Sequence, residues 1–521
     1  MTPRQWLIVI TASIGAMLEV VDVSITNVAL VHIQANLSAS LAEVGWVVTG
    51  YAMASVVVIP LSNWLTAMLG QKTYFLLALL GFTAASVLCG LAANLPLLVL
   101  ARILQGLLGG GLMPMAQAIM YRAVPREQQG VAQGIFGVVI LAGPALGPTI
   151  GGLLTDSLGW RWVFLINVPL GLMTAFVANR AFPSDQRTKG LEEGLEQGGD
   201  RRQPGVDWLG IGLLVLGLAC LQVVLEQGRQ YDWFENQGLR LLALGAALAL
   251  PTFVIWELRR PQPAVDLRVL RHRSLAAGSA FSFLLGAGLY GTVLMVPIFA
   301  QSVLQFTATQ TGLLMLPGAM ASAVAMALLG KNAHRLDPRW LIALGAALMV
   351  ATMMQLSTIG PDTGEHSLYW PLIQRGCTTV MMFLPLTLVS LGSLPKSEVG
   401  SGSGFFSLSR QLGGSFGVAG FTLVLDHQQA VHHAQLVQQI SNNNPLTQQR
   451  LQLLEKLMQF RGQGPGNAEH QALELLIKQV DLQAALLAYG DVFRTIAMVF
   501  ILAIPLVLLM GRASQAQANE T

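Results

Sequence analysis

Residues 6–30, WLIVITASIGAMLEVVDVSITNVAL, decide the fold because an apolar run of membrane-spanning length here contains two carboxyl groups, Glu19 and Asp22. A helix needs about 20 mostly apolar residues to cross the roughly 30 Å hydrocarbon core of a bilayer. Arg4 precedes the run as in a signal peptide, but the run is too long for one and lacks a small-residue cleavage site. We therefore interpret it as a first transmembrane helix that is retained in the protein.

Runs of this kind recur along the whole chain. Of the 521 residues, 53% are hydrophobic and 11% are charged, whereas soluble domains carry about 25% charged residues. The runs are continuous rather than alternating, which argues against a β-barrel, and all three cysteines lie inside them, so no disulfide framework is implied. The sequence predicts an all-α integral membrane protein with fourteen transmembrane helices, at 5–30, 43–65, 73–93, 97–120, 129–154, 160–181, 207–227, 238–257, 275–300, 311–330, 339–357, 367–391, 401–425 and 490–511. The seventh and eighth could instead form one re-entrant pair.

The basic residues give these helices an orientation. Most of the 30 Lys and Arg residues fall in loops on the side that also holds both termini, with five arginines in the segment 259–273. Loops rich in Lys and Arg stay in the cytoplasm. We therefore expect a multi-pass inner-membrane protein with both termini cytoplasmic.

The chain also repeats itself. ARILQGLLGGGLMP at 101–114 corresponds to LIQRGCTTVMMFLP at 372–385, and the Gly/Pro-rich end of the fifth helix corresponds to RQLGGSFGVAG at 410–420. Paired halves around a central site are typical of secondary transporters. The repeat predicts a 6 + 2 + 6 arrangement: a six-helix half at 1–182, a cytoplasmic linker at 183–206, two additional helices at 207–258, and a second six-helix half at 259–521.

The segment 426–489 is long for a loop and lies on the extracytoplasmic side in this arrangement. Its leucines keep helical spacing, which predicts two amphipathic helices separated by the GQGPG sequence at 462–466. His427, His432 and His433 lie here, but without a fourth ligand or a recognised spacing they indicate a solvated loop face rather than a metal site.

Four motifs together resemble the major facilitator superfamily, in its fourteen-helix drug:proton antiporter branch (the EmrB/QacA type). They are LEVVDVSITNVAL at 18–30, RILQG at 102–106, AGPALGPTIGG at 142–152 and GWRWVFLINVPLG at 159–171. The resemblance extends over essentially the whole chain. In detail, the sequence is most similar to the EmrB-like exporters of Gram-negative bacteria. One motif departs from the family: NWLTAMLGQK at 63–72 lacks the Asp expected after the second helix, with Ala67 in its place. Any gating contact that depends on this Asp is in doubt.

The resemblance implies a function and partners. It implies proton-coupled efflux of structurally diverse hydrophobic or cationic drugs. It also implies a periplasmic membrane-fusion adaptor and an outer-membrane channel as partners, and 426–489 is our candidate docking surface for the adaptor. The alternatives are export of one physiological metabolite, siderophore or fatty acid, or a non-transporting membrane sensor or scaffold.

The buried charges are the candidate proton-coupling residues, because charge inside a bilayer is costly and marks functional positions. Glu19 and Asp22 are three residues apart and so share one helix face. Arg102 lies at a similar depth in the fourth helix, close enough in depth to meet Asp22. A carboxyl group that alternates between water and a nearby arginine would carry protons; the alternative is a static pair that only joins the two helices.

The fifth helix carries the pattern associated with antiporters: Gly143, Pro144, Gly147, Pro148, Gly151 and Gly152. Glycines at this spacing give a face without side chains, which allows close helix packing. The hypothesis is a sliding contact between the two halves; the alternative is ordinary packing.

Other polar or adaptable side chains in the spans are candidates to line a substrate cavity, although methionines in such helices more often only pack. These candidates are Asn27, Gln105, Met113, Gln117, Tyr290, Arg375 and Arg410. The chain contains no phosphate-binding loop. We therefore expect an ion gradient as the energy source, no cofactor, no metal, no nucleic-acid partner and no enzymatic reaction.

Overall fold

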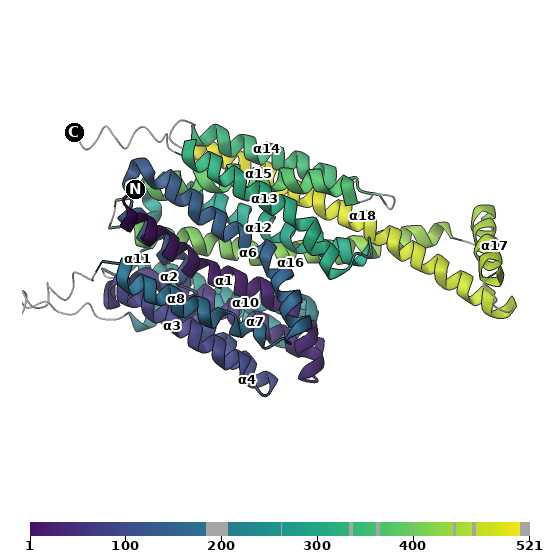
Figure 1. The fold of residues 1–521 in the computed structure, drawn as a ribbon. Helices are drawn as coiled ribbons and strands as arrows, with labels where there is room; N and C mark the ends of the chain where they lie inside the picture. The colour runs from purple at the N-terminus through teal and green to yellow at the C-terminus, as the bar shows by residue number, and fades with distance from the viewer. Residues whose placement is uncertain are drawn as a thin grey trace, which may run out of the picture.

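The computed structural model describes residues 1–183, 207–261, 263–332, 337–360, 365–395, 397–440, 444–460 and 465–510. Every regular element in these ranges is a helix, and the long helices run side by side in two groups (Figure 1). The predicted all-α fold class is confirmed. Twelve of the described helices are long and apolar enough to cross a membrane.

Following the predicted division, we call the helices up to α8 the first half, those from α12 onward the second half, and the two long helices between them the accessory pair. The first half contains α1 (Pro3–Asn36), α2 (Leu41–Leu69), α3 (Gln71–Gly90), α4 (Leu95–Gly109), α5 (Leu112–Ala123), α6 (Gln129–Ser157), α7 (Trp162–Leu165) and α8 (Asn167–Ala181). The accessory pair is α10 (Trp208–Gln227) and α11 (Gln237–Arg259). The second half contains α12 (Arg273–Ser302), α13 (Ala308–Asn332), α14 (Pro338–Ser357), α15 (Glu365–Gly392), α16 (Val399–Gln439), α17 (Pro445–Phe460) and α18 (Pro465–Leu509).

Local sequence signals start several of these helices. Thr2 caps α1 in a capping box, in which its hydroxyl accepts from the backbone N–H of Gln5 and the Gln5 side chain accepts from the backbone N–H of Thr2. Ser40 and Glu43 repeat the arrangement at α2. Gly70 has a φ of 88° and forms the one-residue connection between α2 and α3, a backbone conformation that favours glycine.

Each of the fourteen predicted segments falls largely on helical residues, with three corrections. The segment 160–181 is divided into α7 and α8 at Ile166, and its first two residues precede α7. The segment 97–120 is broken into α4 and α5 at Gly110 and Gly111, where a Cβ on Gly110 would stand 2.6 Å from Cα of Ser55 in α2. The helices predicted to end at 425 and to begin at 490 continue well beyond the bundle as α16 and α18. The second of the two amphipathic helices predicted in 426–489 is therefore the start of α18 rather than a separate helix. The GQGPG sequence lies largely outside the described residues.

The membrane-spanning character of two helices rests on the sequence alone. The twelve helices with sufficient described apolar length do not include α6 or α16. Helix α16 is rich in Gly, Ser and Gln, which lowers its hydropathy, and many of its residues are buried inside the protein. Fourteen crossings therefore remain a prediction.

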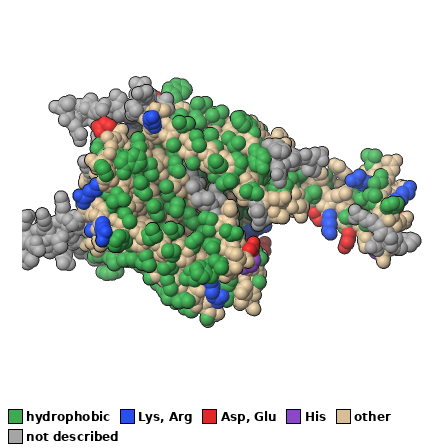
Figure 2. All heavy atoms as spheres, in the orientation of Figure 1, with side chains coloured by type: hydrophobic (Ala, Val, Ile, Leu, Met, Phe, Trp, Pro, Cys, Tyr) green, Lys and Arg blue, Asp and Glu red, His purple; other side chains and the backbone are tan. Residues whose placement is uncertain are grey.

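The surface agrees with a bilayer environment. Figure 2 shows hydrophobic side chains over the face of the bundle and charged side chains at its two ends and on the projecting arm. The start of α1 and the end of α18 lie at the same end of the bundle (Figure 1). Apolar side chains such as Leu248, Val324 and Leu502 are about 60–70% exposed in the helices that bear them, which fits contact with lipid. The chain is a multi-pass membrane protein.

At the opposite end, α16, α17 and α18 form an arm that projects from the bundle (Figure 1). Leu454 of α17 packs against Ala472 and Leu476 of α18. His432 and His433 of α16 lie 2.7 Å and 3.3 Å from carboxylate oxygens of Asp491 and Asp481 in α18. These histidines join the two long helices of the arm.

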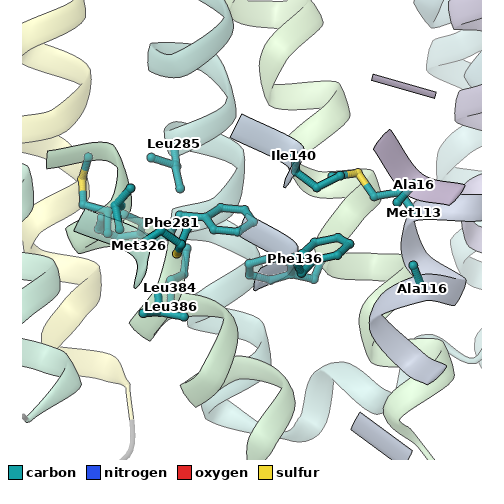
Figure 3. Close-up of a cluster of buried hydrophobic side chains, with 14 of the residues drawn as sticks. Ala16, Met113, Ala116, Phe136, Ile140, Phe281, Leu285, Met326, Leu384 and Leu386 are labelled. Carbon is teal, nitrogen blue, oxygen red and sulfur yellow. The ribbon is translucent and has the colours of Figure 1, made fainter. Parts of the chain in front are cut away.

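One large apolar cluster extends across both halves. Figure 3 shows Ala16, Met113, Ala116, Phe136 and Ile140 of the first half in this cluster with Phe281, Leu285, Met326, Leu384 and Leu386 of the second. Polar contacts join the halves near the end that holds the N-terminus: Asn63 Nδ2 donates to Ser401 Oγ at 2.8 Å, and Tyr121 Oη donates to the carbonyl of Thr387 at 3.0 Å. The segment 63–72, which lacks the family's Asp, therefore still contacts the second half, through Asn63.

The accessory pair packs beside the seam between α2 and α16. Gln227 of α10 donates to Thr49 of α2 at 2.9 Å, and Gln222 donates to Ser415 of α16 at 2.8 Å. Helix α11 packs mainly on α10 and is largely exposed. Helices α10 and α11 are thus two full-length antiparallel helices, each long enough to cross a membrane, rather than short re-entrant segments.

Candidate functional site

The centre of the first half contains an ion pair between α1 and α4. Arg102 Nη1 lies 2.5 Å from Asp22 Oδ2, and both side chains are fully buried. The two residues that the sequence placed at similar depth therefore meet. Removing one partner of a buried pair costs about 3–5 kcal/mol, because the other charge is left uncompensated.

Neutral polar side chains saturate the other carboxylate oxygen. Asp22 Oδ1 accepts from Gln105 Nε2 at 3.0 Å and from Asn167 Nδ2 at 2.7 Å. Ser86 Oγ accepts from the same Gln105 amide nitrogen at 2.7 Å. Four helices of the first half, α1, α3, α4 and α8, thus supply one connected network, to which Gln105 belongs.

A backbone carbonyl and an aromatic ring also contact the guanidinium of Arg102. Its Nε donates to the carbonyl of Val47 in α2 at 3.0 Å, and its plane lies over the Tyr51 ring, 4.3 Å from the ring centre. Arg102 Nη2 is buried without a hydrogen-bond partner. We call the set Asp22, Ser86, Arg102, Gln105 and Asn167 the Asp22 network. All of its members lie in one half, so a rigid movement of that half leaves their mutual distances unchanged.

Glu19 does not join this network. Its Oε2 accepts from the backbone N–H of Met113 at 3.2 Å. Met113 is the second residue of α5, where backbone N–H groups have no acceptor within the helix and the helix dipole favours a carboxylate. Glu19 and Asp22 share one face of α1 but have different neighbours. Glu19 contacts α5, whereas Asp22 contacts α4 and α8.

The same methionine contacts a cation of the second half. Arg410 Nη2 of α16 lies 2.8 Å from Met113 Sδ, and its guanidinium lies 5.4 Å from the centre of the Phe383 ring. Arg410 is 6% exposed, and none of the described carboxylates lies within salt-bridge distance of it. We call Glu19, Met113 and Arg410, with Tyr290 beside them, the Glu19 cluster.

The glycine face of α6 packs on α1, not on the second half. A Cβ on Gly143 would stand 2.9 Å from Val20 Cγ1, one on Gly147 would overlap Ser24, and one on Gly151 would stand 3.2 Å from the carbonyl of Ile25. Gly152 has open space around it. Pro144 and Pro148 lie in the same helix. Gly143, Gly147 and Gly151 therefore meet α1 in this conformation, and a sliding contact between the halves at this face stays a prediction.

Helix α6 meets the second half through other glycines. A Cβ on Gly134 would stand 3.3 Å from Cα of Gly330 in α13, and one on Gly137 would overlap Met326. The backbones of α6 and α13 therefore approach closely near the end that holds the N-terminus.

The remaining candidates are dispersed. Asn27 is exposed on α1, whereas Gln117 on α5 is fully buried, and neither side-chain polar atom of Gln117 has a partner. Tyr290 of α12 lies against Gly414 of α16, where a Cβ would stand 2.6 Å from its ring. Arg375 of α15 belongs to neither set, and its Nη1 is buried without a partner. In the described ranges, no group of three or more His, Cys, Asp or Glu residues is placed to hold a metal ion.

The sequence analysis missed Asn167 and Ser86. Asn167 lies inside GWRWVFLINVPLG, and it is the one amide side chain in that apolar stretch. An amide at membrane depth is itself a signal, because polar side chains in helices that cross a bilayer seek partners on neighbouring helices.

Comparisons with known proteins agree with this fold. Residues 12–418 match the family described as the Major Facilitator Superfamily. The chain is 30% identical to the multidrug export protein EmrB of Haemophilus influenzae over 496 residues, which cover 95% of this chain and 93% of that protein. It is 28% identical to the fatty acid resistance protein FarB of Neisseria gonorrhoeae over 501 residues, 96% of this chain and 95% of that protein. The solved structure of the proton:xylose symporter XylE superposes with a TM-score of 0.60 at 13% identity, over 95% of this chain and 94% of that one.

The fold and the buried network define a polytopic helical membrane protein with a charged centre in its first half. The chain belongs to the Major Facilitator Superfamily. The predicted resemblance to this family and to EmrB-like proteins is confirmed.

Proposed function

We propose that this chain is an efflux transporter that exports hydrophobic or cationic compounds across the inner membrane in exchange for protons. The observation that supports this most is the fully buried Asp22–Arg102 pair inside a bundle of this superfamily. An ionisable pair at membrane depth is costly to keep and therefore indicates function. The name of the EmrB relative, a multidrug export protein, supports export as the direction of transport.

In this proposal the carboxyl groups of Glu19 and Asp22 carry the proton. Desolvation favours the protonated form of each group, and a nearby cation favours the ionised form. A conformational change that admits water to either carboxyl, or that alters the distance between Glu19 and Arg410, would switch a carboxyl between these forms. A cationic substrate would compete with the proton for the same carboxylate.

The arrangement in the membrane is also proposed. The six-helix halves at 1–182 and 259–521 flank the helices at 207–258, and both termini are cytoplasmic, which places the arm of α16, α17 and α18 in the periplasm. A buried leucine and methionine of α17, Leu454 and Met458, hold the arm together, while Leu446 and Phe460 are strongly exposed. The exposed side chains support 426–489 as the docking surface for a membrane-fusion adaptor that connects to an outer-membrane channel.

The central test is transport by the purified chain in proteoliposomes. Addition of ethidium, a hydrophobic cation, should drive proton movement in the wild type, and Asp22→Asn should abolish it while the protein stays folded. Asp156→Asn is the matched control, since the Asp156 side chain is 76% exposed at the end of α6. Proton movement that is unchanged in Asp22→Asn would refute the role of Asp22; no proton movement in the wild type with any substrate would favour a sensor or scaffold.

A second candidate function is export of fatty acids. The name of the FarB relative, a fatty acid resistance protein, favours this alternative. Dodecanoate in place of ethidium separates the two: a chain dedicated to fatty acids should move protons with dodecanoate and not with ethidium, whereas a multidrug exporter should respond to ethidium.

The docking proposal has its own test. Removing the tip of the arm, residues 441–464, should abolish binding of a membrane-fusion adaptor to the chain in nanodiscs. Ethidium-driven proton movement should persist, because the Asp22 network lies far from the arm in sequence and packing. Adaptor binding that survives the deletion would refute the docking surface.

A further inference from the structure

The Glu19 cluster contains two opposite charges from different halves that share one residue. Met113 donates its backbone N–H to Glu19 at 3.2 Å, and its sulfur receives Arg410 Nη2 at 2.8 Å. Glu19 and Met113 belong to α1 and α5 of the first half, whereas Arg410 belongs to α16 of the second. Met113 therefore lies at the junction between the carboxylate and the cation.

Arg410 is poorly compensated where it lies. A thioether sulfur is only a weak hydrogen-bond acceptor, and the Phe383 ring offers a weak cation–π contact at 5.4 Å. Within the described part of the chain, Met113 contacts both Arg410 and the carboxyl group of Glu19, which makes Glu19 the carboxyl group linked to this cation. A buried guanidinium without a carboxylate in contact is expensive, which calls for a role beyond packing.

Arg410 and Glu19 are fixed to different halves of the protein. The carbonyl of Arg410 lies against Gly286 of α12, and Tyr290 packs on Gly414 one turn further along α16. Arg410 is thus fixed to the α12–α16 pair of the second half. Because Glu19 is fixed to the first half, any rocking of one half against the other changes the distance between the two charges.

We infer that Arg410 is the counter-charge of Glu19 in this conformation, and that movement of the second half away from Met113 withdraws it and lets Glu19 bind a proton. This inference rests on the proposed function and gives it a switch. The Asp22 network cannot supply that switch by rocking, since Asp22, Arg102 and their neighbours move together. Arg410 is a positioning residue: it acts on the proton through Glu19.

Other titratable groups belong to the surroundings of Glu19, and none of them provides this switch. Asp22 lies on the same helix as Glu19, and the tyrosines of α2 and α3 lie in the same half. Tyr290 is the other group that approaches from the second half, and it is neutral near neutral pH. The groups concerned are Asp22, Tyr51, Tyr74 and Tyr290.

The test measures the proton on Glu19 directly. In the purified full chain, the infrared band of the protonated carboxyl that disappears in Glu19→Gln reports Glu19, and its intensity is followed across a pH series. In Arg410→Met the pH of half-protonation should rise by roughly one unit, because a nearby cation no longer favours the carboxylate. Arg410→Lys, which keeps the charge, should stay close to the wild type.

Arg375→Met is the matched control, because it removes another buried arginine of the second half that is outside the Glu19 cluster. It should leave the band unchanged. If Arg410→Met leaves the pH of half-protonation where it is, or if Arg375→Met moves it equally, the inference is overturned. If Arg410→Met does not fold, Arg410→Gln replaces it, with size-exclusion profiles checked first.

The readout separates this inference from the proposed function. The infrared band requires no transport, so an Arg410-dependent band in a chain that moves no protons with ethidium or dodecanoate would refute the exporter and keep the charge pair. Ethidium-driven proton movement with a band that does not depend on Arg410 would refute the charge pair and keep the exporter. When both hold, Arg410→Met should also shift the pH profile of proton movement, and the same substitution should have no further effect in Glu19→Gln.

Discussion

The Asp22 network and the Glu19 cluster are two arginine–carboxylate arrangements that start from the same face of α1. They differ in which half of the protein supplies the arginine. In the Asp22 network, the arginine and two amides come from the same half as Asp22 and bond both carboxylate oxygens, and a hydroxyl of that half accepts from the amides. In the Glu19 cluster, the arginine comes from the other half, and its guanidinium contacts a sulfur and lies near an aromatic ring. The first arrangement resists rearrangement, and the second can respond when the halves move.

The difference separates two tasks that sequence spacing would assign to one pair of residues. A saturated pair within one half stabilises that half. A charge supplied across the interface couples protonation to the conformation. The following predictions test this division, beginning with the largest expected effect.

Arg102→Ala should destabilise the protein by about 3–5 kcal/mol, because Asp22 would remain buried without its cation. Arg410→Ala should cost much less, since no carboxylate is in contact with Arg410 to be left unpaired. The free energy of unfolding in mixed micelles, followed by tryptophan fluorescence, measures both. Equal losses would contradict the difference between the two arrangements.

Asn167→Ala should cost about 1.5–3 kcal/mol, the range for a hydrogen bond to a charged group. Its amide donates to Asp22 at 2.7 Å, whereas Ser86 contacts only the amides around that carboxylate. Ser86→Ala should therefore cost less, about 1 kcal/mol. The same unfolding measurement ranks them, and a larger loss for Ser86→Ala would mean that the neutral bonds dominate the network.

Gly147→Ala should destabilise by about 1–3 kcal/mol, because the added methyl overlaps Ser24 and forces α1, which bears both carboxyl groups, away from α6. Gly152→Ala is the control, since nothing lies within 4 Å of the added methyl. Thermal unfolding in detergent should distinguish the two variants. Tolerance of both would mean that the close approach of α1 and α6 is not required.

Met113→Leu should be the mildest change, costing less than about 1.5 kcal/mol as a volume-conserving substitution. The backbone N–H that Glu19 accepts from is kept, and only the sulfur beside Arg410 is lost. The pH dependence of ethidium-driven proton movement should remain close to the wild type. A shift as large as that of Arg410→Met would assign the switch to the sulfur rather than to the charge.

Much of the site could be predicted from the sequence, because charges in apolar runs are conspicuous. Glu19, Asp22, Arg102 and Arg410 were all identified in this way, and the meeting of Asp22 with Arg102 followed from their depth. Asn167 was overlooked because an amide in an apolar stretch is a weaker signal than a charge. The partner of Glu19 was out of reach, since a backbone N–H at a helix start and a methionine sulfur carry no sequence signal of proximity.

The glycines of α6 show the same limit of prediction from sequence. Their spacing predicts a side-chain-free face, and the structure has one. The face meets α1 rather than the second half, since a small face packs against whichever helix lies opposite and the spacing contains no information on that helix. The halves approach instead at Gly134 and Gly330, which the pattern did not single out.

The sequence by itself determined the helices, their apolar character and the charges they bury, because the thickness of a bilayer fixes the length of an apolar run and the cost of burying charge makes each exception visible. It also determined the family, through motifs in α1, α4, α6 and α8. Only the tertiary structure decided which half supplies the partner of each carboxylate. That choice depends on how helices distant in the chain pack together, and a spacing of three residues along α1 places Glu19 and Asp22 on one face without fixing what each of them meets.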